Sequence, residues 1–119
     1  MLRIVVGGAM NKNENAALIE QYGQNQVEVK VMGDLQAAMA LKNGEADYYF
    51  GSCQTGAGGA LSMAIALNGM SKCIPVAMVG KVLDDAEIAA AIAEGKTAFG
   101  FVPEAAATVI PVIMGELLK

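Results

Sequence analysis

Short apolar runs alternate with longer amphipathic or alanine-rich runs along the whole chain of 119 residues. Near-continuous apolar character is typical of parallel strands buried on both faces, and it occurs at residues 2–6, 27–32, 48–52, 74–79 and 97–102. The segments between them have the length of helices, and several begin near Asn or Asp and end before Gly: 13–22, 35–42, 60–68, 85–94 and 104–118. This βα alternation predicts one α/β domain over residues 1–119, a three-layer sandwich with a five-stranded parallel sheet.

Two strand orders suit this pattern. We favour the flavodoxin-like order 2-1-3-4-5, and the Rossmann-like order 3-2-1-4-5 stays open as the alternative. In either order a ligand is expected beyond the carboxyl ends of the strands, where the winding of the sheet reverses. In the favoured order the first and third strands are neighbours, so the turns at 7–11 and 52–56 border one crevice.

A glycine-rich loop joins the third predicted strand to the third predicted helix. Its glycines let the backbone approach a ligand closely, and N–H groups at a helix start attract anions. The sequence therefore predicts a site for a small anionic or phosphorylated metabolite on this loop. The candidate ligand-binding residues are Ser52, Cys53, Gln54, Thr55, Gly56, Ala57, Gly58 and Gly59, with Asn11 and Lys81 as secondary contacts. The alternative is that the glycines serve only a tight turn and close helix packing.

Cys53 is the weak catalytic candidate, because a helix N-terminus lowers the pKa of a nearby thiol. The chain has no histidine, which removes a Cys/His pair and the commonest metal ligand, and we expect no metal site. Cys73 begins the fourth strand at the opposite rim of the sheet, too far from Cys53 for a disulfide. Neither a Walker A motif nor a complete dinucleotide fingerprint is present, so no cofactor is expected. Whether a reaction is catalysed stays open.

The chain is apolar and mildly acidic, with 55% hydrophobic residues and a net charge of -4. The eight basic residues form no stripe, which argues against nucleic acid as a partner. The uncharged span at 48–71 fits a buried strand, a loop and a helix better than a membrane helix. Two cysteines and no cleavable signal pattern predict a cytoplasmic location. The strongly apolar segment 104–118 predicts a subunit contact in a homo-oligomer.

Three segments, 34–39, 47–58 and 92–100, together resemble the YhfU-like family of small bacterial proteins of unknown function. The resemblance covers nearly the whole chain and implies a role in a small-metabolite pathway. The pattern Cys53-x-Thr55-Gly56-x-Gly58 is more loosely similar to the loop of type B ribose-5-phosphate isomerases. That similarity implies a cysteine acting as a base beside a loop that holds the substrate. A non-catalytic interaction or regulatory subunit, working beside a transporter or metabolic enzyme, is the alternative function.

Overall fold

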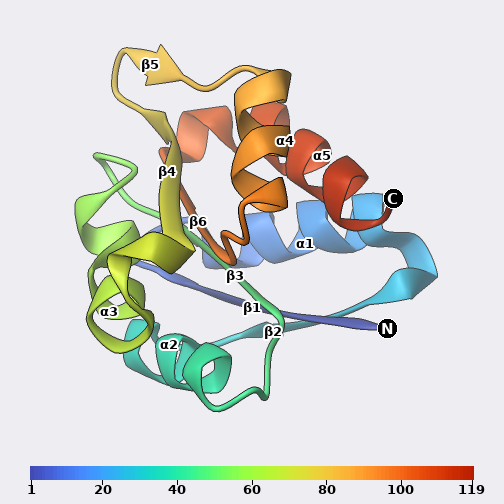
Figure 1. Ribbon diagram of the computed structural model, residues 1–119, viewed down its shortest axis with the longest axis vertical. Helices are drawn as coiled ribbons and strands as arrows, with labels where there is room; N and C mark the ends of the chain where they lie inside the picture. The colour runs from blue at the N-terminus through green and yellow to red at the C-terminus, as the bar shows by residue number, and fades with distance from the viewer.

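A six-stranded sheet lies between two layers of helices in the computed structural model, which describes residues 1–119 (Figure 1). The strands are β1 (Leu2–Gly8), β2 (Val27–Val31), β3 (Tyr48–Ser52), β4 (Cys73–Met78), β5 (Lys81–Val82) and β6 (Ala98–Phe101). The helices are α1 (Lys12–Gly23), α2 (Asp34–Lys42), α3 (Gly58–Asn68), α4 (Asp85–Ala93) and α5 (Ala106–Leu117). Short 3₁₀ turns are η1 (Gln24–Gln26), η2 (Met70–Lys72) and η3 (Pro103–Ala105). The predicted α/β sandwich is confirmed, with β5 as an additional short antiparallel strand.

The strand order is β2-β1-β3-β6-β4-β5. The predicted adjacency of the first and third strands is confirmed, because β1 pairs in parallel with both β2 and β3. Both predicted orders are nevertheless wrong at the other end of the sheet. The last predicted strand, β6, lies between β3 and β4 instead of next to β4 at the edge.

The position of β6 between β3 and β4 determines on which face of the sheet α4 lies. Parallel crossovers are right-handed, so the face on which a helix lies depends on the direction of the step across the sheet. The chain steps back from β4 to β6, as it does from β1 to β2, and α4 therefore lies on the same face as α1. Figure 1 shows α1, α4 and α5 on one side of the sheet and α2 and α3 on the other. In the predicted order α4 would have joined α2 and α3, leaving α5 without a neighbour on one flank.

The apolar side chains of α5 form part of the hydrophobic core. Val109, Ile110, Ile113 and Met114 are each at most 1% exposed. They belong to the core between the sheet and the layer of α1, α4 and α5, and α5 packs against both other helices. The buried side of segment 104–118 is thus explained within one copy of the chain, and a subunit contact through its remaining surface stays a prediction.

Local signals set some of the helix boundaries. Asp84 caps α4 in a capping box with Glu87, as its position predicts. Gly44 and Gly95 adopt positive φ just after α2 and α4, as helix-terminating glycines do. Asp34 is not the expected cap, because Gly33 is the N-cap of α2 and Asp34 lies in the first turn. None of the helices combines the length and apolar character needed to cross a bilayer.

Candidate functional site

The turn after β1 folds over the end of β3. Ala9 and Met10 both donate their N–H groups to the Ser52 carbonyl, at 2.9 and 3.1 Å. Gly8 has a φ of +84°, and a Cβ there would lie 2.5 Å from the Ser52 nitrogen. Only glycine fits that position. The two turns that the sequence places at one crevice are therefore in direct contact.

A buried chain of polar side chains fixes the first turn. The Asn15 amide donates to Ser52 Oγ at 2.9 Å, and Ser52 Oγ donates to the Met10 carbonyl at 2.6 Å. Asn11, in the left-handed conformation at the start of α1, donates to Asn15 Oδ1 at 3.0 Å. Asn15 and Ser52 are fully buried. Ser52 and Asn11 thus support the crevice from behind, and Asn15 is a supporting residue that the sequence analysis missed.

The turn after β3 is pressed against the ends of β6 and β4. Gly56 has a φ of +83°, and a Cβ on it would collide with the Ala77 carbonyl oxygen. A Cβ on Gly100, in β6, would lie 2.5 Å from the Gly56 carbonyl oxygen. The Cys53 N–H donates to the Phe101 carbonyl at 3.2 Å. Backbone contacts therefore hold this turn rigidly in place.

The predicted nest of free amides is only partly present. Thr55 Oγ1 accepts hydrogen bonds from the N–H groups of Ala57 at 3.4 Å and Gly58 at 3.1 Å. These two amides already have a partner inside the protein, whereas the N–H of Gly59 donates to no acceptor within the chain. The Thr55 side chain is exposed, and its hydroxyl joins these two amides to the Cys53 thiol.

Cys53 lies behind this loop with its sulfur 3.4 Å from Thr55 Oγ1. Burial raises the pKa of the Cys53 thiol, but hydrogen bonds from the Thr55 hydroxyl and from nearby backbone N–H groups outweigh it and lower the pKa below 9.0. The pKa of Cys73 is raised by burial, and both thiols are free. Of the two cysteines, Cys53 is therefore the more readily ionised.

One cleft of about 340 Å³ joins the two turns. Its lining consists of Ala9, Met10, Cys53, Gln54, Thr55 and Gly59. Among the other predicted site residues, Gly56, Ala57 and Gly58 shape the loop behind it. Lys81 is exposed on β5, at the far end of the sheet, and does not line the cleft.

Tyr49 connects the end of β1, at Gly7, to the start of α3. Its hydroxyl donates to the Ala60 carbonyl at 2.6 Å, and a Cβ on Gly7 would lie 3.0 Å from that hydroxyl. Burial raises the pKa of Tyr49 far above its ordinary value, and the charge of Asp34 raises it further. The buried Oδ1 of Asp34 has no hydrogen-bond partner, and Asp34 does not line the cleft.

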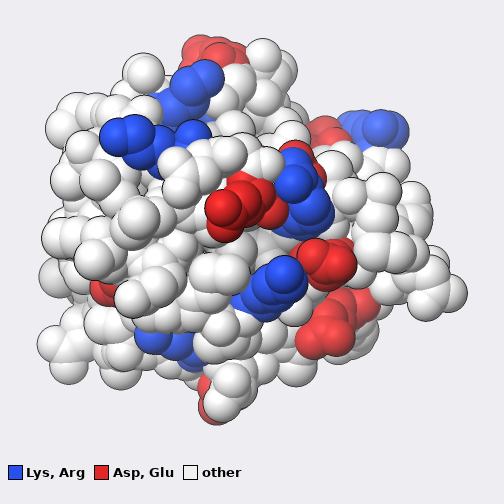
Figure 2. Space-filling model, turned by 90° about the horizontal axis from the view of Figure 1, so that it is seen from below, with Lys and Arg blue, Asp and Glu red and all other residues white.

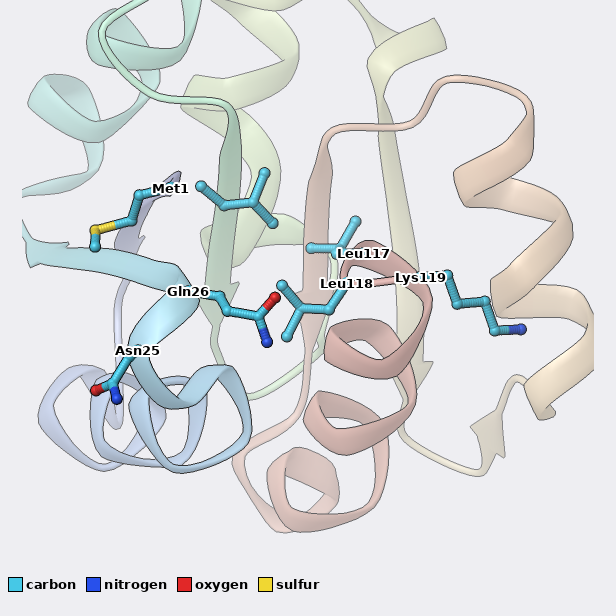
Figure 3. Close-up of a pocket in the computed structure, with 7 residues that line it drawn as sticks. Met1, Asn25, Gln26, Leu117, Leu118 and Lys119 are labelled. Atoms are coloured by element: carbon cyan, nitrogen blue, oxygen red, sulfur yellow. The ribbon is translucent and has the colours of Figure 1, made fainter.

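The structure contains other clefts away from these loops. One of about 540 Å³ lies at the opposite rim, where β1 begins and α5 ends (Figure 3). Its lining offers apolar side chains such as Leu118, the amides of Asn25 and Gln26, and the ammonium group of Lys119. The cleft at the turns after β1 and β3 alone combines a thiol, a hydroxyl and a helix N-terminus.

Comparison with known proteins identifies relatives over nearly the whole chain. Residues 2–117 match the family described as "Protein of unknown function DUF2620". The uncharacterised YhfU proteins of Escherichia coli K12 and Shigella flexneri are each 41% identical over 117 residues, covering 98% of this chain and 99% of the relative. The resemblance noted in the sequence is confirmed.

Solved structures show where else this fold occurs. Type B ribose 5-phosphate isomerase from Trypanosoma brucei superposes with a TM-score of 0.70 at 16% identity, covering 100% of this chain and 87% of that one. The Trypanosoma cruzi enzyme gives a TM-score of 0.69 at 11% identity, over 98% and 85% of the two chains. At this identity the likeness establishes the Rossmann-like fold alone.

Proposed function

The chain belongs to the DUF2620 family of unknown function, and we propose from its own site that it binds a small anionic metabolite, in particular a phosphorylated one, in the cleft between the turns after β1 and β3. The observation that carries the proposal is that Thr55 and Gly59, at the start of α3, line that cleft together with Cys53. A helix N-terminus and free backbone N–H groups stabilise phosphate and carboxylate groups.

Two further features support this proposal. The loop lies at the carboxyl end of a central strand beside the point where the winding reverses, as ligand sites in open α/β sheets do. The structural neighbours are type B ribose 5-phosphate isomerases, whose substrate is a sugar phosphate. A cleft of about 340 Å³ matches a ligand of that size.

In this proposal Cys53 is the only acid–base group of the cleft lining. Its lowered pKa makes it the candidate to exchange a proton with a bound metabolite. The chain has no histidine to assist it. The proposed function is therefore ligand binding, and catalysis by Cys53 is tested separately.

A charge placed at the cleft mouth tests the binding proposal. Gly59→Asp brings a carboxylate to the start of α3, where an acidic residue favours the helix. Its Cβ would lie 3.3 Å from Cys53 Cβ, so urea unfolding without ligand must show that the variant folds. Ser62→Asp, at an exposed position one turn further along α3, is the matched control. A ligand at ten times its dissociation constant adds about 1.4 kcal/mol to the free energy of unfolding.

We expect inorganic phosphate or ribose 5-phosphate to raise the melting temperature of the wild type and of Ser62→Asp, but not of Gly59→Asp. The same ligands should slow alkylation of Cys53 by iodoacetamide and leave Cys73 unaffected, because only Cys53 lines the cleft. Equal stabilisation of Gly59→Asp and the wild type would refute the proposed location.

The alternative is a non-catalytic interaction subunit. It is favoured by one observation: Leu35, Met39 and Met63 on α2 and α3 are each 39% to 47% exposed. Such a patch suits a protein partner. In that case none of the anions would stabilise the wild type, and charged substitutions at Met39 or Met63, rather than at Gly59, would abolish function.

A further inference from the structure

The outer edge of β2 is the longest free edge of the sheet. β2 pairs only with β1, and no strand covers its other side (Figure 1). At the opposite end β5 has only two residues. Free N–H and C=O groups along an edge strand form a template for another strand, unless the side chains prevent pairing.

The hydrogen bonds within the sheet show which residues of β2 face outward. The N–H of Met32 donates to the Val6 carbonyl at 2.9 Å, so Met32 directs its backbone groups toward β1. Backbone direction alternates along a strand, so Lys30 and Glu28 also direct theirs toward β1. The backbone groups of Val27, Val29 and Val31 therefore point to the free edge.

We infer that this edge is a homodimer interface, at which β2 of a second copy pairs antiparallel around a two-fold axis at Val29. In this register Val29 lies opposite Val29 of the partner subunit, and Val27 lies opposite Val31 of the partner subunit. These are the residues whose backbone groups point outward, so every one of those groups gains a partner in a hydrogen-bonded pair. The two sheets become one continuous sheet.

The charges on β2 fit the same register. Glu28 lies opposite Lys30 of the partner subunit, in the non-hydrogen-bonded pairs where the chains approach most closely. Moving the axis by one residue would place Glu28 opposite Glu28 of the partner subunit, or Lys30 opposite Lys30 of the partner subunit. Only the axis at Val29 avoids like charges while keeping the outward groups paired.

These side chains are available for such contacts. Within one copy, Lys30 Nζ and Glu28 Oε1 are 3.9 Å apart, with the side chains 63% and 53% exposed. An exposed ion pair of this length is weak and is able to exchange partners. Figure 2, which views the molecule from the side of β2 and α2, shows acidic and basic groups intermingled rather than one repelling sign. On the other face of β2, Val27 and Val29 pack against the core beside α1, whereas Val31 is 44% exposed, so the fold does not depend on the two charges.

Charge reversal tests the register. Sedimentation equilibrium should show a wild-type dimer in the micromolar range. Glu28→Lys and Lys30→Glu each turn both cross-strand attractions into repulsions, and each should raise the dissociation constant at least about tenfold. The double variant Glu28→Lys/Lys30→Glu restores every pair and should dimerise like the wild type. Glu94→Lys, at an exposed position after α4, makes the same change in net charge as Glu28→Lys and should have no effect.

Mixing the two single variants provides a second test. Glu28→Lys places two basic side chains on one strand, and Lys30→Glu places two acidic ones on the other. The mixture should therefore form a heterodimer more tightly than either variant associates with itself. A wild type that remains monomeric, or single variants that dimerise like the wild type, would overturn the inference. Thermal unfolding of each variant confirms that the fold is unchanged.

Discussion

The turn that carries the candidate site depends on a backbone contact that only glycine permits at position 56. Gly56→Ala adds a methyl group where φ is +83°, toward the Ala77 carbonyl oxygen. Gly80→Ala is the matched comparison, because Gly80 has a φ of +78° and no atom within 4 Å of a built Cβ. Both variants carry the same conformational strain, and only the first carries the collision.

The expected losses in the free energy of unfolding follow from the conformational strain and from the collision. Left-handed backbone costs a non-glycine residue about 1 to 2 kcal/mol, which is the whole expected loss for Gly80→Ala. Forcing a methyl group into packed structure adds about 1 to 3 kcal/mol, so Gly56→Ala should lose about 2 to 5 kcal/mol. That is a large fraction of the roughly 5 to 15 kcal/mol by which domains are stable.

Urea unfolding of the two variants measures the difference directly. Gly56→Ala should unfold at a much lower urea concentration than Gly80→Ala, with a similar dependence on urea if both remain two-state. Equal losses of free energy in the two variants would refute the reasoning. The turn would then be free to move away from Ala77, and the cleft that it borders would not be preformed.

Three other substitutions test the supports of the site and the pH dependence of the fold. Asn15→Leu removes a fully buried link between the two turns and should cost about 1 to 3 kcal/mol in urea unfolding; a variant as stable as the wild type would contradict the network. Tyr49→Phe keeps the ring but loses the bond to the Ala60 carbonyl, which should cost about 1 kcal/mol in the same assay. Arg3 lowers the pKa of Asp47 below 3.8 through a side-chain hydrogen bond and its backbone N–H. The contribution of this pair to the free energy of unfolding is therefore present above pH 3.8 and is lost as the pH falls through the lowered pKa. Arg3→Met should therefore destabilise the protein at neutral pH and make little difference below that lowered pKa, and a loss that persists unchanged in acid would contradict this assignment.

Much of the fold follows from local pattern. Each predicted strand and helix exists, because continuous apolar runs and helix-ending glycines such as Gly44 and Gly95 act locally. The position of β6 could not be predicted in the same way. The third, fourth and fifth predicted strands are all apolar, so their sequences do not distinguish which of them are neighbours, and α4 and α5 pack together only in the assembled layer. That is a property of the assembled layers rather than of any one segment.

The sequence places the two turns at one cleft, as the structure does, and the binding of a ligand there stays a prediction. The residues of the loop were identified because Gly56, Gly58 and Gly59 follow a buried strand and precede a helix. The sequence does not show that the Thr55 side chain turns back to its own loop, since that depends on rotamer and turn geometry. Asn15 was missed as well. A polar residue on the buried side of a helix, next to Ala16 and one turn from Ile19, is the signal that would have identified it.

The occupied amides have a consequence for affinity. Ala57 and Gly58 donate their N–H groups to the Thr55 hydroxyl and do not line the cleft, so a phosphate bound there gains no hydrogen bond from these two amides. Gly59 adds one new bond, and no lysine or arginine lines the cleft. A bare anion should therefore bind weakly, and the remainder of a true ligand must supply the specificity through Met10, Gln54 and the Cys53 thiol.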